Sequence, residues 1–219
     1  GVELWKSDGT TAGTVRVADI QFSNDGSAPE SLVNIGDTLY FTALYESSYD
    51  LWKSDGTSEG TVRVADIYPG ASGGRPYSLI NVGDKLYFSA NEGTHGYELW
   101  TSDGTTVGTV RLADINPGNG SSFPAVLTNV GGLLYFRAND GTSGVELWKS
   151  DGMASGTGLL KDINPGMAPS TPTQFVASGA NLFFTATTVA NGVEDAVGPQ
   201  IKLRATLPQL LGLPTVEIA

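Results

Sequence analysis

A tandem repeat constrains the fold of this chain more than any other feature. The string Leu-Trp-Lys-Ser-Asp-Gly-Thr, or a near copy of it, occurs four times around Trp5, Trp52, Trp100 and Trp148, so successive copies lie 47, 48 and 48 residues apart. Each copy is followed by a Gly-Thr pair, an apolar stretch ending in Asp-Ile and a later Leu-(Tyr/Phe)-Phe string. Repeats of this length form units that bury their apolar faces against one another.

Each repeat predicts four short strands. In one unit they are expected at residues 78–82, 85–90, 97–102 and 109–115, each bounded by Gly, Asp, Asn or Pro. Asp103-Gly104 stands between the last two, where a tight reversal needs backbone torsions that this pair tolerates. Pro117-Gly118 ends the pairing after the fourth strand and lets the chain cross to the next sheet. We therefore predict an all-β chain folded as a β-propeller of four-stranded antiparallel blades.

The pairing of the strands expected near the two ends of the chain determines the number of blades. The chain opens on the third and fourth strands of a unit, and residues 175–177 and 182–186 supply a first and a second strand. Pairing these with residues 2–20 would close a ring of four blades, whereas a further C-terminal sheet would give five.

A decayed fifth copy lies near residues 192–197. It begins in register at residue 192, but Asp195-Ala196 stands in place of Leu-Trp. The repeat domain is therefore expected to span residues 1–197. Residues 198–219 are expected to form a tail or the start of a following domain.

Charge and composition exclude several classes of function. Asp and Glu total 23 against 12 Lys and Arg, and the net charge of −11 repels phosphate backbones and anionic lipid, so we expect no nucleic-acid partner. There is no cysteine, hence no disulfide and no thiolate metal site. The longest apolar segment near the C-terminus, 207–213, is short and contains Pro208, so no membrane insertion is expected. Because the sequence begins in mid-motif, it is expected to be a piece of a larger polypeptide.

One unit, LYFSANEGTHGYELWTSDGTTVGTVRLADINPG, resembles the bacterial ELWxxDGT repeat family, and the likeness extends over residues 1 to about 194. The resemblance implies a propeller-like β-architecture in a large secreted or cell-surface protein, but no characterised activity. The strand order is also similar to that of kelch-type propellers, and the repeat length to that of tachylectin-type lectins. These likenesses are architectural, and a fold alone does not carry a function.

Catalytic motifs are nearly absent, so we predict a non-enzymatic protein with no catalytic residues. His95 is the single histidine, its counterpart in the next unit is Ser143, and no Gly-x-Ser-x-Gly string occurs. A polysaccharide-active enzyme is the alternative, because glycoside hydrolysis needs only two suitably spaced carboxylates. The less regular acids Glu46, Glu92 and Asp140 are its candidates, although each lies in an expected loop.

No cofactor is certain, but calcium is a candidate. Hard cations bind carboxylate and carbonyl oxygens presented by glycine-bearing loops. The Asp-Ile crossings place such carboxylates at one end of the predicted blades, and the expected ligands are Asp19, Asp66, Asp114 and Asp162. A calcium-stabilised scaffold is therefore one possible function.

The same end of the blades suggests a binding surface. Sugar sites combine directed polar groups with an aromatic surface, and both occur in the Asn-(Asp/Glu)-Gly-Thr loops and beside them. The predicted ligand-binding residues are Asn91, His95, Tyr97, Asn139 and Asp140. We expect an extracellular binding, adhesion or spacer module that presents an acidic loop face to a surface glycan or protein. A lectin with several weak equivalent sites is the alternative.

Overall fold

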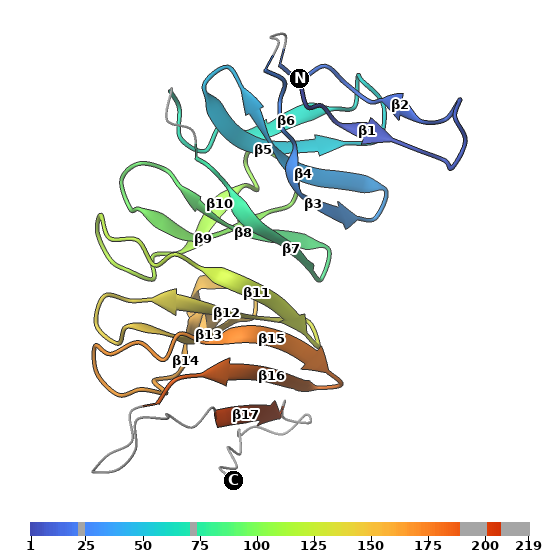
Figure 1. The fold of residues 1–219 in the computed structure, drawn as a ribbon. Coiled ribbons are helices and arrows are strands. Elements are labelled where there is room, and N and C mark those ends of the chain that lie inside the picture. The colour runs from blue at the N-terminus through green and yellow to red at the C-terminus, as the bar shows by residue number, and fades with distance from the viewer. Residues whose placement is uncertain (22–24, 71–73, 189–200, 207–219) are drawn as a thin grey trace.

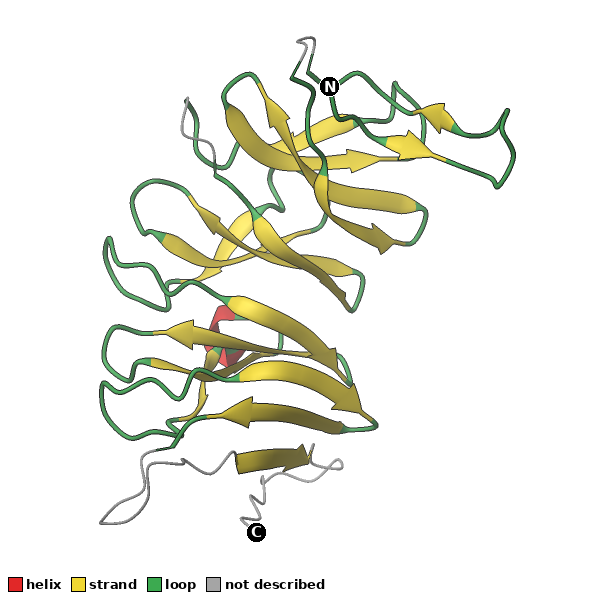
Figure 2. Cartoon of the chain, in the orientation of Figure 1, coloured by secondary structure: helices red, strands yellow, loops and turns green. Residues whose placement is uncertain are grey.

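The chain is built from short antiparallel strands (Figure 1, Figure 2). The computed structural model describes residues 1–21, 25–70 and 74–188, together with the backbone of residues 201–206. Within these segments the one helical element is a 3-10 turn at Ala154–Gly156, and no helix is long and apolar enough to span a bilayer. The predicted all-β class is confirmed.

The strands group into five sheets that follow the repeat. The N-terminal half-sheet contains β1 (Trp5–Lys6) and β2 (Val15–Arg16). Sheet I contains β3 (Glu30–Ile35), β4 (Thr38–Tyr45), β5 (Ser48–Ser54) and β6 (Val62–Ala65). Sheet II contains β7 (Tyr77–Val82), β8 (Lys85–Asn91), β9 (Tyr97–Ser102) and β10 (Val110–Ala113). Sheet III contains β11 (Ala125–Val130), β12 (Leu133–Asn139), β13 (Val145–Ser150) and β14 (Gly158–Lys161). The C-terminal sheet contains β15 (Thr173–Ser178), β16 (Asn181–Ala186) and β17 (Ile201–Thr206).

Each sheet is an antiparallel meander whose strands pair in chain order. The four strands predicted in one unit coincide with β7 to β10 of sheet II and differ from them only at their ends. The Asp-Gly pair lies where β9 and β10 reverse, and Gly104 has φ of +85°, a left-handed value that suits glycine. The sequence pattern therefore predicted the repeating unit correctly.

Successive sheets stack face to face along the chain (Figure 1). The first strands β3, β7, β11 and β15 lie side by side, and the N-terminal half-sheet and the C-terminal sheet lie at opposite ends of the stack. All the interfaces are apolar, and the two between complete sheets have the same composition. One sheet contributes a Tyr, a Leu and an Ile, and the next contributes a Leu, a Phe, an Ala and a Trp. Trp52, Trp100 and Trp148 are buried there, as the predicted filler role requires, whereas Trp5 is exposed.

The structure does not join the two ends of the chain into a ring. The second strand of the C-terminal sheet, β16, pairs with β15 on one side and with β17 on the other, so residues 201–206 take the edge at which β1 was expected. The decayed copy near 192–197 and the boundary at residue 197 lie outside the described residues. Both stay predictions.

Gly104 provides a test of how closely the sheets pack. A Cβ at Gly104 would lie 2.2 Å from the hydroxyl of Tyr40 in the preceding sheet, whereas one at Gly9, with φ of +90°, would meet nothing within 4 Å. Gly104→Ala should therefore lower the free energy of unfolding by about 2 kcal/mol, and Gly9→Ala by about 1 kcal/mol from backbone strain alone. Urea denaturation of both variants checks this. Equal losses would contradict the close contact.

Candidate functional site

The loops between second and third strands and the crossings between sheets lie at the same end of each sheet, along one side of the stack, which we call the loop face. Across each junction the two loop types touch. A Cβ at Gly93 would lie 2.5 Å from Cζ of Tyr68, and one at Gly141 would lie 2.8 Å from Oδ1 of Asn116. The crossings of one sheet therefore pack on the loops of the next.

A buried glutamate organises this packing. Glu98, the acid of the Glu-Leu-Trp string, is fully buried, and its carboxylate accepts hydrogen bonds from the backbone N–H groups of Ile115 (2.8 Å), Asn116 (3.3 Å) and Ser122 (3.1 Å) and from the hydroxyl of Ser122 (2.7 Å). Burial raises the pKa of Glu98, although these hydrogen bonds act in the opposite direction. One carboxylate thus holds both ends of a crossing loop.

The same anchor recurs in the other repeats. Glu146 accepts from Ile163 N (2.9 Å), Ser170 N (2.8 Å) and Ser170 Oγ (2.5 Å), and Glu3 accepts from both groups of Ser27. The loop-anchoring carboxylates are Glu3, Glu98 and Glu146, and Asp50 has the same place in the string of sheet I. None of these acids was predicted as a site residue, because an acid inside the repeated string does not reveal its hydrogen-bond partners in the sequence.

Sheet I carries a variant of this anchor. The shorter Asp50 accepts from Ser48 Oγ (2.8 Å) and from Arg63 Nη1 (3.2 Å), and Gly74 stands where the other crossings have serine. Burial raises the pKa of Asp50, and the contacts with Ser48 and Arg63 oppose that effect. The acid and the crossing residue have therefore changed together in this repeat.

Three of the predicted ligand residues hold their own loops. Asn91 Oδ1 accepts from Gly93 N (2.6 Å), and Asn139 Oδ1 accepts from Gly141 N (2.8 Å). Asp140 accepts from the N–H groups of Thr142 and Ser143 and from Ser143 Oγ. Burial acts to raise the pKa of Asp140, but these bonds outweigh it and the pKa lies below its ordinary value. Asn and Asp side chains commonly accept such hydrogen bonds from the backbone of their own turns.

His95 is placed in a small ionic group at the side of sheet II. Its Nδ1 contacts Glu92 Oε1 and lies 2.8 Å from Thr94 Oγ1, and Glu92 is 3.7 Å from Arg111. A catalytic relay needs the acid on one ring nitrogen and the nucleophile on the other, but here both contact Nδ1. The arrangement closes a loop and provides no nucleophile–base pair.

The predicted calcium ligands are separated from one another, and arginines face most of them. Asp19, Asp66 and Asp114 lie 3.1, 3.5 and 3.3 Å from the arginine three residues earlier. Asp162 has no such arginine and accepts from Gly166 N at 3.3 Å. Across the described ranges, no three His, Cys, Asp or Glu side chains come together closely enough to hold a metal ion. The described residues therefore bring no group of ligands together, and the calcium site stays a prediction.

A second repeated feature of the loop face presents different side chains on one backbone frame. In each crossing the residue between Ser (or Gly74) and Pro has a left-handed φ of 40° to 48°, and its N–H donates to the carbonyl of the residue before the anchoring acid. The four donor and acceptor pairs are Ala28 and Val2, Arg75 and Tyr49, Phe123 and Tyr97, and Thr171 and Val145. The backbone contacts repeat at 3.0 to 3.2 Å, while the side chains change from pair to pair.

The two central pairs and Tyr77, whose ring lies beside that of Tyr97, form a surface that we call the aromatic strip: Tyr49, Arg75, Tyr77, Tyr97 and Phe123. The ring of Tyr97 lies 5.6 Å from those of both Tyr77 and Phe123 and stacks on the latter, and the Arg75 guanidinium lies 6.0 Å from the ring of Tyr49. Phe123 is 57% exposed. Of the predicted ligand residues, Tyr97 alone belongs to this strip, and Phe123 was not predicted because the neighbouring sheet sets its exposure.

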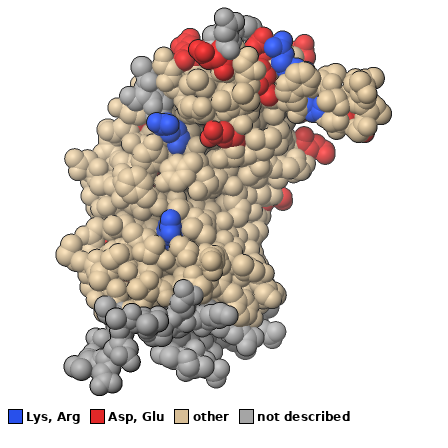
Figure 3. All heavy atoms as spheres, in the orientation of Figure 1, with Lys and Arg blue, Asp and Glu red and all other residues tan. Residues whose placement is uncertain are grey.

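Acidic side chains are unevenly distributed over the face of the molecule that Figure 3 shows. In Figure 3 the acidic side chains gather over the N-terminal end, and the middle of the visible face is largely uncharged with isolated basic side chains. Within the described segments, Arg75 has no carboxylate within ion-pair distance. The strip therefore combines one exposed ring and three half-buried rings with an arginine that has no carboxylate partner in the described part of the chain.

Fold and site together define a tandem-repeat all-β protein with one repeated backbone frame. No protein-family model matches the sequence, and no curated protein does. Among solved structures, puromycin hydrolase (16% identity, TM-score 0.46) matches over 74% of this chain and 25% of its own. A prolyl endopeptidase (15% identity, TM-score 0.47) matches over 78% of this chain and 23% of its own. An α-L-arabinofuranosidase from Clostridium thermocellum (14% identity, TM-score 0.39) matches over 89% of this chain and 74% of its own. The chain thus spans about a quarter of the first two, and these distant likenesses carry no functional argument.

Proposed function

We propose that the chain is a β-propeller-type, non-enzymatic binding module that holds a glycan on the aromatic strip. The observation that carries this proposal is the backbone frame that repeats four times with variable side chains. A frame held by its own hydrogen bonds leaves the side chains free to serve recognition, as loops on a rigid scaffold commonly do. The propeller architecture is supported by the adjacent first strands β3, β7, β11 and β15.

A glycan suits the chemistry of the strip. Sugar rings have apolar C–H faces that pack on exposed aromatic rings, while their hydroxyl groups need directed polar partners. Phe123 and Tyr97 offer the stacking surface, and Arg75 offers five N–H donors with no competing carboxylate nearby among the described residues. A single strip of this size would bind weakly, and repetition in a longer protein would strengthen attachment.

Binding is favoured over catalysis because the polar groups of the loop face already have structural partners. His95 contacts Glu92 and Thr94, and Asp140 closes its own loop. The extracellular setting and membership of the ELWxxDGT repeat family belong to the same proposal and rest on the sequence resemblance. A calcium-stabilised scaffold is the second candidate, motivated by the unpartnered Oδ1 of Asp162, which is buried.

A glycan array followed by titration of any hit tests the proposal. Phe123→Ala should weaken binding about tenfold through loss of one stacked ring. It should leave the melting temperature nearly unchanged, because the side chain is exposed. Val107→Ala, at a 90% exposed apolar side chain in the β9–β10 loop, is the matched control and should bind as the parent does.

Three outcomes would contradict the proposal. They are an array without hits, equal binding by the Phe123→Ala variant, and turnover of the bound glycan. A calcium-induced rise in melting temperature together with a silent array would favour the scaffold function instead.

A further inference from the structure

Two arginines depart from the pattern that the repeat sets for the others. Arg16, Arg63 and Arg111 have the same place in successive repeats, and each forms an ion pair with the aspartate three residues later. Arg75 and Arg137 have no carboxylate within ion-pair distance among the residues that the structure describes. Asp and Glu total 23 against 12 Lys and Arg, so a shortage of acids does not explain this difference.

Arg75 is exposed and occupies the variable position of its crossing. Its backbone N–H donates to the carbonyl of Tyr49 at 3.1 Å, and its guanidinium lies 6.0 Å from the centre of the Tyr49 ring. The backbone frame and the ring therefore hold this charge at the loop face.

Arg137, in β12 of sheet III, is the second departure. The other three sheets have short hydroxyl side chains at this position: Thr42, Ser89 and Thr185. Arg137 lies opposite Ala125 of β11, which has the place that Tyr77 has in sheet II. A long side chain thus stands where the repeat has a short one, and a short side chain stands opposite it where sheet II has a tyrosine.

The charge of Arg137 acts on a ring of the aromatic strip. Burial raises the pKa of Tyr77, and the positive charge of Arg137 opposes that effect. The ring of Tyr77 lies 5.6 Å from that of Tyr97, which stacks on Phe123. Two arginines without a carboxylate partner in the described ranges therefore adjoin one group of rings.

We infer that the glycan held on the aromatic strip is anionic, and that Arg75 and Arg137 bind its carboxylate or sulfate groups. This inference rests on the proposed function and names the class of its ligand. A guanidinium is planar, and its N–H donors match the oxygens of an anionic group in pairs. In an acidic sugar that group is attached to a ring with apolar C–H faces, so one sugar residue can contact an arginine and an aromatic ring together.

The net charge of −11 does not oppose such a ligand at this place. In Figure 3 the acidic side chains gather over the N-terminal end, and the middle of the visible face has isolated basic side chains. At physiological ionic strength, exposed charges more than about 8 Å apart are largely screened from one another. The field at the strip is therefore set mainly by its own arginines.

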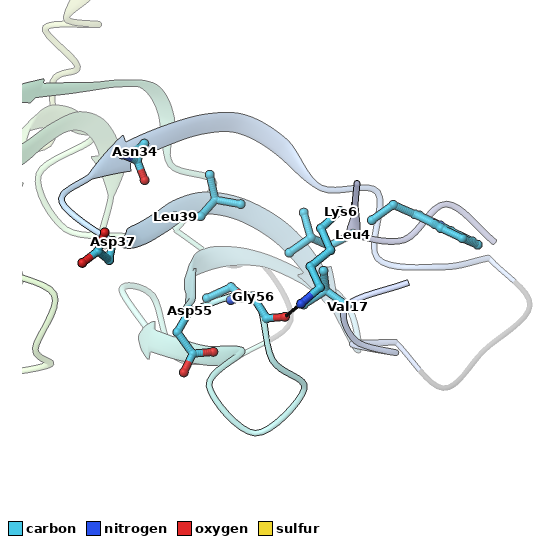
Figure 4. A pocket seen from close by; sticks show the side chains of 10 residues that line it. Leu4, Lys6, Val17, Asn34, Asp37, Leu39, Asp55 and Gly56 are labelled. Atoms are coloured by element: carbon cyan, nitrogen blue, oxygen red, sulfur yellow. Dashed lines mark hydrogen bonds between the residues drawn. The ribbon is translucent and has the colours of Figure 1, made fainter. Parts of the chain in front are cut away.

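The hollow between the N-terminal half-sheet and sheet I provides a contrast. It has a volume of about 180 Å³, and Asp37 and Asp55 are among the residues that line it. Lys6 also lines it, but Lys6 Nζ already donates to the carbonyl of Gly56 at 2.8 Å (Figure 4). Carboxylates and an occupied ammonium group suit an anion poorly, so the strip is the better place for one.

An array with matched acidic and neutral probes tests the inference. One pair is polygalacturonate and the neutral galactan made from it by reduction of its carboxyl groups, and the other pair is dextran sulfate and dextran. The chain should bind at least one acidic probe about tenfold more tightly than its neutral partner, because only the acidic probe accepts charge-assisted hydrogen bonds. Tighter binding of polygalacturonate identifies a carboxylate as the bound group, and tighter binding of dextran sulfate identifies a sulfate ester.

Arginine variants connect this preference to the strip. Arg75→Gln and Arg137→Gln should each weaken binding of the acidic probe about fivefold, a modest factor because solvent partly screens the charges. Arg75→Lys keeps the charge without the planar fork and should recover only part of the affinity. Arg16→Gln, at an arginine that already pairs with Asp19, removes the same charge outside the strip and is the matched control. Melting temperatures show whether each variant is folded, and Arg75→Gln decides if Arg137→Gln is not.

The inference is overturned if the neutral probes bind as tightly as the acidic ones, or if Arg16→Gln weakens binding as much as Arg75→Gln does. Equal binding of acidic and neutral probes that is weakened by Phe123→Ala would retain the proposed function and remove only the anionic class of its ligand. An array on which neither acidic nor neutral glycans bind would overturn both.

Discussion

Replacement of Trp100 by alanine should lower the free energy of unfolding by about 3 to 5 kcal/mol. The indole is 7% exposed, lies 6.4 Å from the ring of Phe88 and packs on Tyr40 and Leu51 of the preceding sheet. Its Nε1 has no hydrogen-bond partner among the described residues, so its contribution to stability is packing alone. Urea denaturation followed by circular dichroism measures the loss.

Two variants bracket that result. Trp100→Phe keeps a ring in the interface and should cost about 1 to 2 kcal/mol, and the exposed Val107→Ala should stay within about 0.5 kcal/mol of the parent. A loss below about 1 kcal/mol for Trp100→Ala would mean that the sheets do not pack through their tryptophans.

Glu98→Ala should cost about 3 kcal/mol or more at neutral pH. Removing the carboxylate leaves the N–H groups of Ile115 and Asn116 and the hydroxyl of Ser122 without their main acceptor in a buried place, and each unsatisfied group costs about 1 to 3 kcal/mol. Glu98→Gln keeps one acceptor oxygen and should lose about 1 to 2 kcal/mol. The measurement is again urea denaturation.

The control for this variant is Glu59→Ala, at an exposed acid in the β5–β6 loop, which should change stability by less than about 0.5 kcal/mol. Equal effects of the two alanine variants would remove the anchoring role of Glu98. If Glu98→Ala strongly lowers the free energy of unfolding and Glu98→Gln leaves it unchanged, the volume of the side chain and not its charge stabilises the crossing.

Much of the fold could be predicted because the same pattern of strands and turns occurs four times in the sequence. Alternation in 85–90 and the Asp-Gly reversal at Gly104 located the strands of sheet II. The left-handed residues in the first strands could not be predicted in this way. Ser31, Ser78, Val126 and Gln174 have φ of 55° to 57°, and none of them belongs to the residue types that signal such a conformation. Each of them lies in a β-bulge, where the register of the first strand against the second shifts.

The candidate site was predicted less well, for a physical reason. An Asn or Asp in a short loop has the same composition whether it binds a ligand or holds its own turn, and Asn91 and Asp140 do the latter. Glu98 and Phe123 were missed because burial and exposure are set by the neighbouring sheet. A signal for Glu98 was nevertheless present, since an acid precedes Leu-Trp in every repeat and a serine follows it 24 residues later in three of them.

The left-handed residue of each crossing has an evolutionary consequence. Ala28, Arg75, Phe123 and Thr171 share one backbone conformation that none of these side chains favours, and a β-branched residue such as Thr171 suits it least. Folding therefore does not select the side chain there, because the anchoring acid and the backbone bond hold the geometry. A pair such as Tyr97 and Phe123 can be gained or lost at any junction by two substitutions. The side chains presented at these positions can therefore change along such an array while the fold is preserved.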